Sequence, residues 1–348
     1  MPNTKPNMFF IDDVCPACYY HEKYKSNKIN WKSREKEFRK LIRDIKQKKS
    51  ENFDAVVGVS GGKDSISQVH YLLKSGLRVL AVNVDYGLKT AIGKKNLDII
   101  PSMGASLIIY RPNLKIHKKI LKISFEKYGD PDLMSHCLLY AIPIRMAIKF
   151  RIPLVFLGEN SALEYSGDDK YDPKKISTKW FKKYAANNGI TPKTFSKKHN
   201  IPYKYMINYD LPSAQNLNKV LCVFCSYYFK WDSLKNLRIA KKYGFLSLKK
   251  NGEGTFRKYV GIDEKINRIH QYLKFLKFGY GRATDHACED IRNGKINRRM
   301  AITLVKKYDR VKITKFYYKD FINFIGIKEK NFFKILNKFK NFNLQKKI

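Results

Sequence analysis

The chain has 348 residues, of which 44% are hydrophobic, so it can bury a full core and is expected to hold one α/β domain with appended helical parts. The formal net charge is +40 at pH 7, but lysine is scattered along the chain rather than gathered in a stripe, which favours a lysine-coated surface over a dedicated nucleic-acid face. Nothing resembles a signal peptide, and no apolar run reaches the roughly 18 residues of a membrane span, so the sequence predicts a cytoplasmic protein.

The chain starts with a cysteine pair, which is followed by a charged amphipathic helix. Cys15 and Cys18 precede residues 32–49, where Phe38, Leu41 and Ile45 recur on one face of the predicted helix. We assign residues 1–50 to this N-terminal segment because the first apolar strand begins just after it.

Residues 51–167 alternate short apolar runs with segments of helical periodicity. Strands are predicted at 54–59, 77–84, 106–110 and 153–158, and helices at 66–74, 90–103, 115–128 and 135–150. Strands that alternate with helices indicate a parallel sheet that is covered on both faces.

The most specific motif lies between the first strand and the helix after it. It reads Ser60-Gly61-Gly62-Lys63-Asp64-Ser65. The glycines allow a sharp turn, and the N–H groups of the helix start, the serine hydroxyls and the Lys63 ammonium group can all donate to phosphate oxygens. The spacing differs from the G-x-x-x-x-G-K-[ST] phosphate loop and resembles the S-G-G-x-D-S loop of ATP pyrophosphatases, which cleave ATP between the α and β phosphates. The alternative is that the two glycines only form a tight turn.

This resemblance implies an α/β fold class with a parallel-sheet pyrophosphate-loop domain of the adenine nucleotide α-hydrolase-like type. Ligands of such sheets bind beyond the carboxyl ends of the strands, where the loop, Asp85 and Glu159 are all predicted to lie. Residues 168–218 are polar and rich in proline, and we expect an insertion or lid there. Residues 219–348 hold the second cysteine pair and a helical C-terminal region, with helices predicted at 234–242, 263–278, 283–292 and 296–308.

The two C-x₂-C pairs are candidates for a structural metal site. Cys15 with Cys18, and Cys222 with Cys225, each have the spacing that presents two thiolates to a tetrahedral ion. A four-thiolate Zn²⁺ site would fasten the N-terminal segment to the region after the insertion. A redox role and buried cysteines without metal are the alternatives.

Three further motifs carry a closer family resemblance. They are Gly158 to Gly167, the Tyr227-Tyr228-Phe229-Lys230-Trp231 run and Gly279 to Arg292. Together with the loop and the cysteine pairs, they are similar to bacterial N-acetyl sugar amidotransferases of surface-polysaccharide and flagellin-glycan biosynthesis, over roughly residues 10–310. Tyr227, Tyr228 and Trp231 themselves are expected in the core beside the metal site rather than as a platform for a sugar.

The resemblance implies that a sugar acetamido group becomes an acetamidino group. ATP would activate the amide oxygen as an adenylate, and ammonia would then replace that oxygen. Lys63 would stabilise charge on the leaving pyrophosphate, and Asp64 or Glu159 would hold Mg²⁺. Asp85 would lie near adenine or ribose, with a helix cap as its alternative role.

Two groups of residues are predicted to meet the sugar. Asn160, Glu164 and Tyr165 follow the fourth strand, and turn formation is their alternative role. Arg282, Asp285 and His286 offer a cation for a sugar carboxylate or phosphate and a proton acceptor for the incoming amine. Their alternative is a hydrogen-bonded helix start after two glycines.

No glutaminase nucleophile is evident in the sequence. Cys137 and Cys288 stand alone on helical faces and are expected to be small core residues, so ammonia would come from a separate glutaminase through an ammonia-conducting subunit. Two other functions stay open: a tRNA-modifying pyrophosphate-loop enzyme with a catalytic cysteine near the loop, and a non-catalytic nucleotide-binding subunit.

Overall fold

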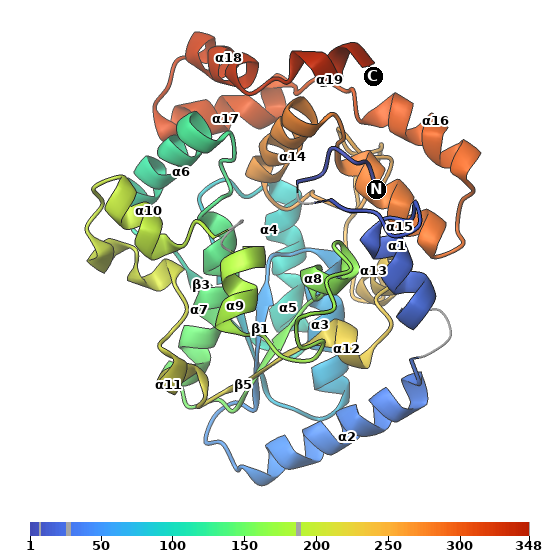
Figure 1. The fold of residues 1–348 in the computed structure, drawn as a ribbon. Coiled ribbons are helices and arrows are strands. Elements are labelled where there is room, and N and C mark those ends of the chain that lie inside the picture. Colours follow the sequence, from blue (N-terminus) through green and yellow to red (C-terminus); the bar gives the residue numbers. More distant parts are fainter. Residues whose placement is uncertain (7, 26–28, 186–188, 348) are drawn as a thin grey trace.

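A five-stranded parallel sheet with the strand order β3-β2-β1-β4-β5 forms the centre of the protein (Figure 1). The computed structural model describes residues 1–6, 8–25, 29–185 and 189–347. The strands are β1 (Ala55–Val59), β2 (Val79–Val84), β3 (Ser106–Tyr110), β4 (Leu154–Leu157) and β5 (Leu221–Phe224). The predicted α/β class with a parallel sheet is confirmed, and each of the four predicted strands is present.

The fifth strand was not predicted. It pairs in parallel with β4 along residues 221–224, so the second cysteine pair begins inside the sheet. The apolar run from Val220 to Phe224 indicates a strand. The C-x₂-C spacing in the same run predicts metal ligands in a turn instead, and this second pattern hid the strand.

Helices cover both faces of the sheet and continue into a helical C-terminal part. In chain order they are α1 (Pro16–Tyr20), η1 (His21–Lys25), α2 (Trp31–Gln47), α3 (Lys63–Lys74), α4 (Ala91–Leu97), α5 (Ile99–Ser102), α6 (Leu114–Tyr128), α7 (Ser135–Lys149), α8 (Ser161–Glu164), α9 (Thr178–Trp180), η2 (Phe181–Ala185), α10 (Pro192–Lys198), η3 (Tyr203–Tyr205), η4 (Ile207–Tyr209), α11 (Ala214–Leu217), α12 (Cys225–Tyr228), α13 (Ser233–Lys241), α14 (Lys265–Phe278), α15 (Arg282–Arg292), α16 (Arg298–Tyr308), α17 (Lys315–Ile325), α18 (Glu329–Lys338) and α19 (Phe342–Lys347). The helix predicted at 90–103 is two helices that meet at Asp98, and Pro101 lacks the N–H that a continuous helix would need there.

Successive residues of the central strands point into separate cores. Val56 of β1 packs with α7 on one face, whereas Ala55 and Val57 pack with α2 and α3 on the other. Because both faces are covered, β1 and β2 are almost wholly apolar instead of alternating with polar residues.

The segment 168–218 lies between β4 and β5 and contributes to the core on the α7 side. Trp180, Phe181 and Phe195 are almost completely buried there. This segment is therefore packed against α7 by apolar contacts, in addition to following the end of β4.

The last helices form a third core with α6 and α14. The rings of Phe125 and Phe332 stack at 5.3 Å, and Phe321 meets Phe125 edge-on at the same centroid distance. These helices lie along one side of the molecule, and the C-terminus is there (Figure 1). No described helix has the length and apolarity needed to cross a membrane.

Candidate active site

The Ser60–Ser65 loop adopts the predicted strand–turn–helix geometry. β1 ends at Val59, α3 begins at Lys63, and Gly61 between them has a φ of +89°. Ser60 Oγ accepts a hydrogen bond from the Gly62 N–H at 3.2 Å, and Ser65 Oγ donates to the Gly62 carbonyl at 2.9 Å. Among the described residues no side chain caps the start of α3, so its first N–H groups are available to an anion.

Lys63 and Asp64 form an ion pair at the start of α3. Lys63 Nζ lies 2.5 Å from Asp64 Oδ2, and the Lys63 side chain is only 4% exposed. Asn236 of α13 holds the other carboxylate oxygen through a hydrogen bond of 2.8 Å from its Nδ2 to Asp64 Oδ1. Asn236, which is far from the loop in the sequence, therefore holds the Asp64 carboxylate in place.

Three backbone segments meet closely beside the loop. A Cβ on Gly61 would lie 2.5 Å from the Gly93 carbonyl oxygen, and a Cβ on Gly93 would lie 2.5 Å from the Asp263 carbonyl oxygen. The Asp263 carboxylate lies close to Gly62, because an ideal Cβ there would be 3.7 Å from Asp263 Oδ2. Sequence reasoning missed both Gly93 and Asp263, since nothing in the chain links them to residues 60–65.

A buried ion pair lies next to this contact. Lys89 Nζ is 2.8 Å from Glu264 Oε1 and 3.3 Å from the Ser60 carbonyl oxygen. The other oxygen of Glu264 is buried without a partner among the described residues. Burial raises the pKa of Glu264 to about 7, although the Lys89 charge opposes the shift.

Asp85 lies at the end of β2, as predicted, but its carboxylate is already occupied. It accepts the Gly87 N–H at 2.9 Å and Arg111 Nε at 2.8 Å. Burial alone would raise the pKa of Asp85, and these two partners lower it below its usual value. A nucleotide contact at Asp85 stays a prediction.

Glu159 faces the loop from the end of β4. Tyr165 donates to Glu159 Oε1 at 3.1 Å. Burial, and then the nearby charge of Asp64, raise the pKa of Glu159, so the two carboxylates approach each other closely enough to interact. Carboxylate oxygens are the ligands that Mg²⁺ prefers, so this pair fits a Mg²⁺ ion.

Asn160 has a structural role here rather than the predicted substrate contact. It is completely buried and caps α8 by accepting the Ala162 N–H at 3.1 Å. It also accepts Trp180 Nε1 at 2.8 Å and donates to the Asp172 carbonyl, so both ends of its amide have protein partners.

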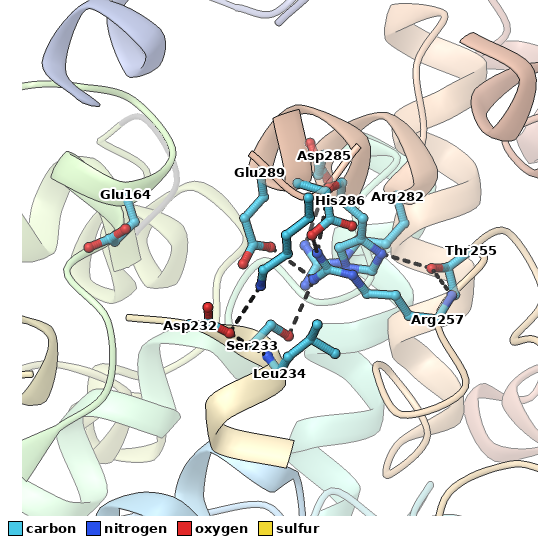
Figure 2. A network of polar contacts seen from close by, with 12 residues as sticks. Glu164, Asp232, Ser233, Leu234, Thr255, Arg257, Arg282, Asp285, His286 and Glu289 are labelled. Atoms are coloured by element: carbon cyan, nitrogen blue, oxygen red, sulfur yellow. Dashed lines mark hydrogen bonds and ion pairs between the residues drawn. The ribbon is translucent and has the colours of Figure 1, made fainter. Parts of the chain in front are cut away.

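Arg282, Asp285 and His286 lie together on α15, as the sequence indicated (Figure 2). The Asp285 carboxylate accepts a hydrogen bond from Lys274 Nζ, and its Oδ2 lies 3.7 Å from Arg282 Nη1. His286 is 3% exposed, and its Nδ1 shares a hydrogen bond of 2.8 Å with Thr255 Oγ1. Burial, together with the charges of Arg282 and Arg257, lowers the pKa of His286 well below its usual value, so its ring is neutral at pH 7.

The buried Arg257 organises this helix, and the sequence did not reveal it. Its guanidinium group donates to Glu289 at 2.9 Å, to Asp290 at 2.7 Å and to Ser233 Oγ at 3.3 Å (Figure 2). It thereby ties α15 to the start of α13, next to Asn236, which holds Asp64. Glu164 lies on a separate segment (Figure 2), and its carbonyl accepts a hydrogen bond of 3.4 Å from Arg292 at the end of α15.

The structure does not support the predicted zinc site. Cys222 lies in β5 and Cys225 is the first residue of α12, and the two residues belong to different cores. α1 is held elsewhere, against the segment after α8, where a Cβ on Gly167 would lie only 2.1 Å from the Pro16 carbonyl oxygen. Among the described residues no group of three or more His, Cys, Asp and Glu side chains is placed to bind a metal ion.

Of the two lone cysteines, Cys137 is not activated for nucleophilic attack. Cys137 is completely buried on α7, and burial raises the pKa of its thiol. Its Sγ lies 3.5 Å from the Ala185 carbonyl oxygen. Cys288 lies half-buried on α15. Tyr228 is in the core, as expected, with its ring against Phe38.

A family model matches the C-terminal region of the chain. Residues 253–347, which include α14 to α19, match the family model described as "LPS biosynthesis protein WbpG-like, C-terminal domain". No curated protein matches the chain.

Two solved structures resemble the chain at low identity. NMN synthetase from Francisella tularensis is 14% identical with a TM-score of 0.30, over 62% of this chain and 93% of that one. NAD+ synthetase from Burkholderia pseudomallei is 14% identical with a TM-score of 0.28, over 66% of this chain and 92% of that one.

Proposed function

We propose that this chain is an ATP-dependent N-acetyl sugar amidotransferase of bacterial surface-polysaccharide (LPS) biosynthesis, and the match of residues 253–347 to the WbpG-like C-terminal domain supports this. The observation that carries the proposal is the loop: an uncapped start of α3 with Lys63 and Asp64 on it, opposite Glu159.

The proposed reaction has two steps and needs no reactant besides the sugar, ATP and ammonia. The acetamido oxygen attacks the α-phosphorus of ATP, the bond to the β-phosphate breaks, and pyrophosphate leaves. Ammonia then attacks the activated carbon, the carbon–oxygen bond breaks, and AMP leaves an amidine that has lost one oxygen and gained one N–H group.

The residues of the loop fit the first step. The N–H groups of the α3 start and the Lys63 ammonium group would stabilise charge on the leaving pyrophosphate. Asp64 and Glu159 would hold Mg²⁺, which neutralises phosphate charge when bound. A loaded site would also relieve the repulsion between these two carboxylates.

Residues of α15, with Glu164 and Tyr165 at α8, would bind an acidic or nucleotide-linked sugar. Arg282 has a buried Nε without a partner among the described residues, and it is the candidate for a carboxylate or phosphate of the substrate. The neutral His286 is the candidate proton acceptor. Glu164, Tyr165 and Asp285 stay candidates for substrate contact.

A separate glutaminase and an ammonia-conducting subunit would supply the ammonia. The tRNA-modifying alternative predicts a catalytic cysteine near the loop. Cys225 interacts there with Asp64 and Glu159, but it is buried and burial raises the pKa of its thiol well above the usual value. The burial of this cysteine therefore favours an N-acetyl sugar over a tRNA base as the substrate.

Product analysis with a lysine variant tests the proposal. Protein incubated with ATP, Mg²⁺, ammonium and candidate N-acetyl sugars should form AMP, pyrophosphate and an amidino sugar, measured by mass spectrometry. Lys63→Ala should lower kcat by roughly 10²- to 10³-fold because it removes a charge at the leaving group. Lys74→Ala, at the exposed other end of α3, is the matched control and should leave kcat unchanged. Formation of ADP and phosphate instead would overturn the assignment.

A further inference from the structure

A line of polar side chains in α7 and the turn just before it has no role so far. Asp132, His136 and Tyr140 are four residues apart, and the His136 N–H donates to the Asp132 carbonyl at 3.0 Å, so helical spacing extends back to Asp132. These three side chains are exposed or half-buried, whereas the residues between them are mostly buried. They therefore mark the open side of a helix that otherwise packs on the sheet.

This line leads from the loop to Asp132. Burial, and then the charge of Glu159, raise the pKa of Tyr140, so Tyr140 lies near the carboxylate that faces Asp64. At the other end, Asp132 is within electrostatic range of Asp263, whose carboxylate lies beside Gly62. Asp132 thus belongs to the same edge of the sheet as the phosphate loop.

Asp132 shares its neighbouring cation, His270, with Asp130. His270 of α14 is paired with Asp130, at 2.7 Å from Nδ1 to Oδ1, and its charge also lowers the pKa of Asp132. The Asp132 carboxylate makes no ion pair within the described part of the chain. Lys274, also on α14, is bonded to Asp285 instead.

Ser135 and His136 add hydrogen-bond acceptors beside Asp132. Ser135 is completely buried, and its hydroxyl lies beside the Asp132 carboxylate and lowers the pKa of that carboxyl. Its Oγ has no other hydrogen-bond partner among the described residues. The His136 side chain reaches the surface, but the protein around its ring lowers the pKa of His136, so the ring is neutral and keeps a lone pair at pH 7. A carboxylate, a hydroxyl and a neutral imidazole are all acceptors, which suits a small cation with several N–H donors.

The protonation of Asp132 is poised near neutral pH. Burial raises the pKa of Asp132 to about 7, while His270 lowers it and Asp130 and Asp263 raise it. The carboxylate can therefore take up a proton and release it again near the pH of the cell.

We propose that Asp132 binds the ammonium ion used in the amidotransferase reaction and takes its proton. The ammonium N–H bond breaks, the proton moves to the carboxylate, and the nitrogen lone pair becomes free to form the bond to the activated carbon. The proton then passes from Asp132 to water. The inference rests on the proposed function and adds to it the residue that receives the nucleophile.

An isosteric variant tests this role. Asp132→Asn should raise the KM for ammonium at pH 7 by roughly 10- to 100-fold, because a charged acceptor is lost, and leave the KM for ATP unchanged. The defect should shrink as the pH rises toward 9, where more free ammonia is present. Hydroxylamine, which is unprotonated at neutral pH, should serve the variant nearly as well as the wild-type protein.

Two controls separate this role from folding. Asp44→Asn is the matched substitution on the exposed surface of α2 and should change none of these values. Thermal unfolding of Asp132→Asn should match that of the wild-type protein. Ser135→Ala should raise the KM for ammonium by a smaller factor, since it removes a neutral acceptor only.

A binding measurement keeps the inference separate from the proposed reaction. Ammonium chloride, titrated against potassium chloride at constant ionic strength, should shift the NMR signals of the His136 ring in the wild-type protein and not in Asp132→Asn. If both proteins respond alike, or if neither responds, Asp132 is not the ammonium site whatever the reaction is. If the His136 signals shift as expected but no N-acetyl sugar is converted, the ammonium site stands and the amidotransferase reaction fails.

Discussion

At the scale of single residues, Gly61 shows how a missing side chain lets separate backbone segments meet. Its φ of +89° lies in the left-handed region, and a Cβ would come within 2.5 Å of the Gly93 carbonyl oxygen. The phosphate loop therefore needs glycine for two independent reasons, its own conformation and the close approach of α4.

We expect Gly61→Ala to lower the free energy of unfolding by about 3 kcal/mol, from backbone strain and from a clash with rigid backbone. It should also abolish ATP binding, measured by calorimetry. Gly104→Ala is the matched control, since Gly104 has a φ of +101° with nothing within 4 Å of its Cβ position. That variant should lose only about 1 kcal/mol in urea unfolding. Equal losses in the two variants would show that the contact with Gly93 is not rigid.

At the scale of elements, α15 depends on a carboxylate from the end of α16. α15 begins after Gly281, which has no side chain to cap it, and Asp309 accepts the N–H groups of Gly281 and Ala283, each at 2.8 Å. Thr284 also donates its hydroxyl to Asp309. Asp309, which lies in the region that matches the family model, thus positions the helix that carries Arg282 and His286.

Asp309→Ala should destabilise the protein by about 2 kcal/mol, because it leaves buried N–H groups without acceptors. Asp309→Asn keeps one oxygen acceptor and should cost less than half of that. Both values come from urea unfolding. If the alanine variant is as stable as the asparagine variant, α15 does not rely on this cap.

At the scale of the whole molecule, acidic side chains come together at one edge of the sheet although the net charge is positive, and Lys63, Lys89 and Arg111 are paired with three of them. The chain carries +40, yet acidic side chains gather at the carboxyl edge of the sheet. They are Asp64, Asp85, Asp132, Glu159, Asp263 and Glu264. A basic surface attracts ATP and acidic sugars, whereas the acidic edge can hold cations such as Mg²⁺ and ammonium.

Because the proposed function takes its ammonia from a separate glutaminase, the purified chain should use free ammonium and not glutamine. Adding the cognate glutaminase should confer the use of glutamine. Dependence on that partner should weaken above pH 8, because more ammonium is deprotonated to the nucleophilic form. The measurement is the rate of AMP formation with each nitrogen donor at several pH values. Strong glutamine-dependent turnover by this chain alone would point to a nucleophile at Cys137 or Cys288.

The sequence by itself determined the features that depend on local chemistry. The loop from Ser60 to Ser65, the strand before it and the helix after it follow from glycine geometry, apolar periodicity and the free N–H groups of a helix start. The alternation of strands and helices likewise predicted the parallel sheet. It also predicted that Glu159 would lie near the loop, because parallel strands end at one edge.

Only the tertiary structure decided which distant residues share a site, because spacing along the chain does not say where a segment packs. The C-x₂-C spacing of Cys222 and Cys225 suggested metal binding, yet Cys222 lies in β5 and the two side chains point into different cores. Asn160 follows β4 as predicted but is turned inward to cap α8. Asp132 and Asp263 carry no motif at all, and the packing of α7 and α14 around the sheet edge is what brings them to the loop.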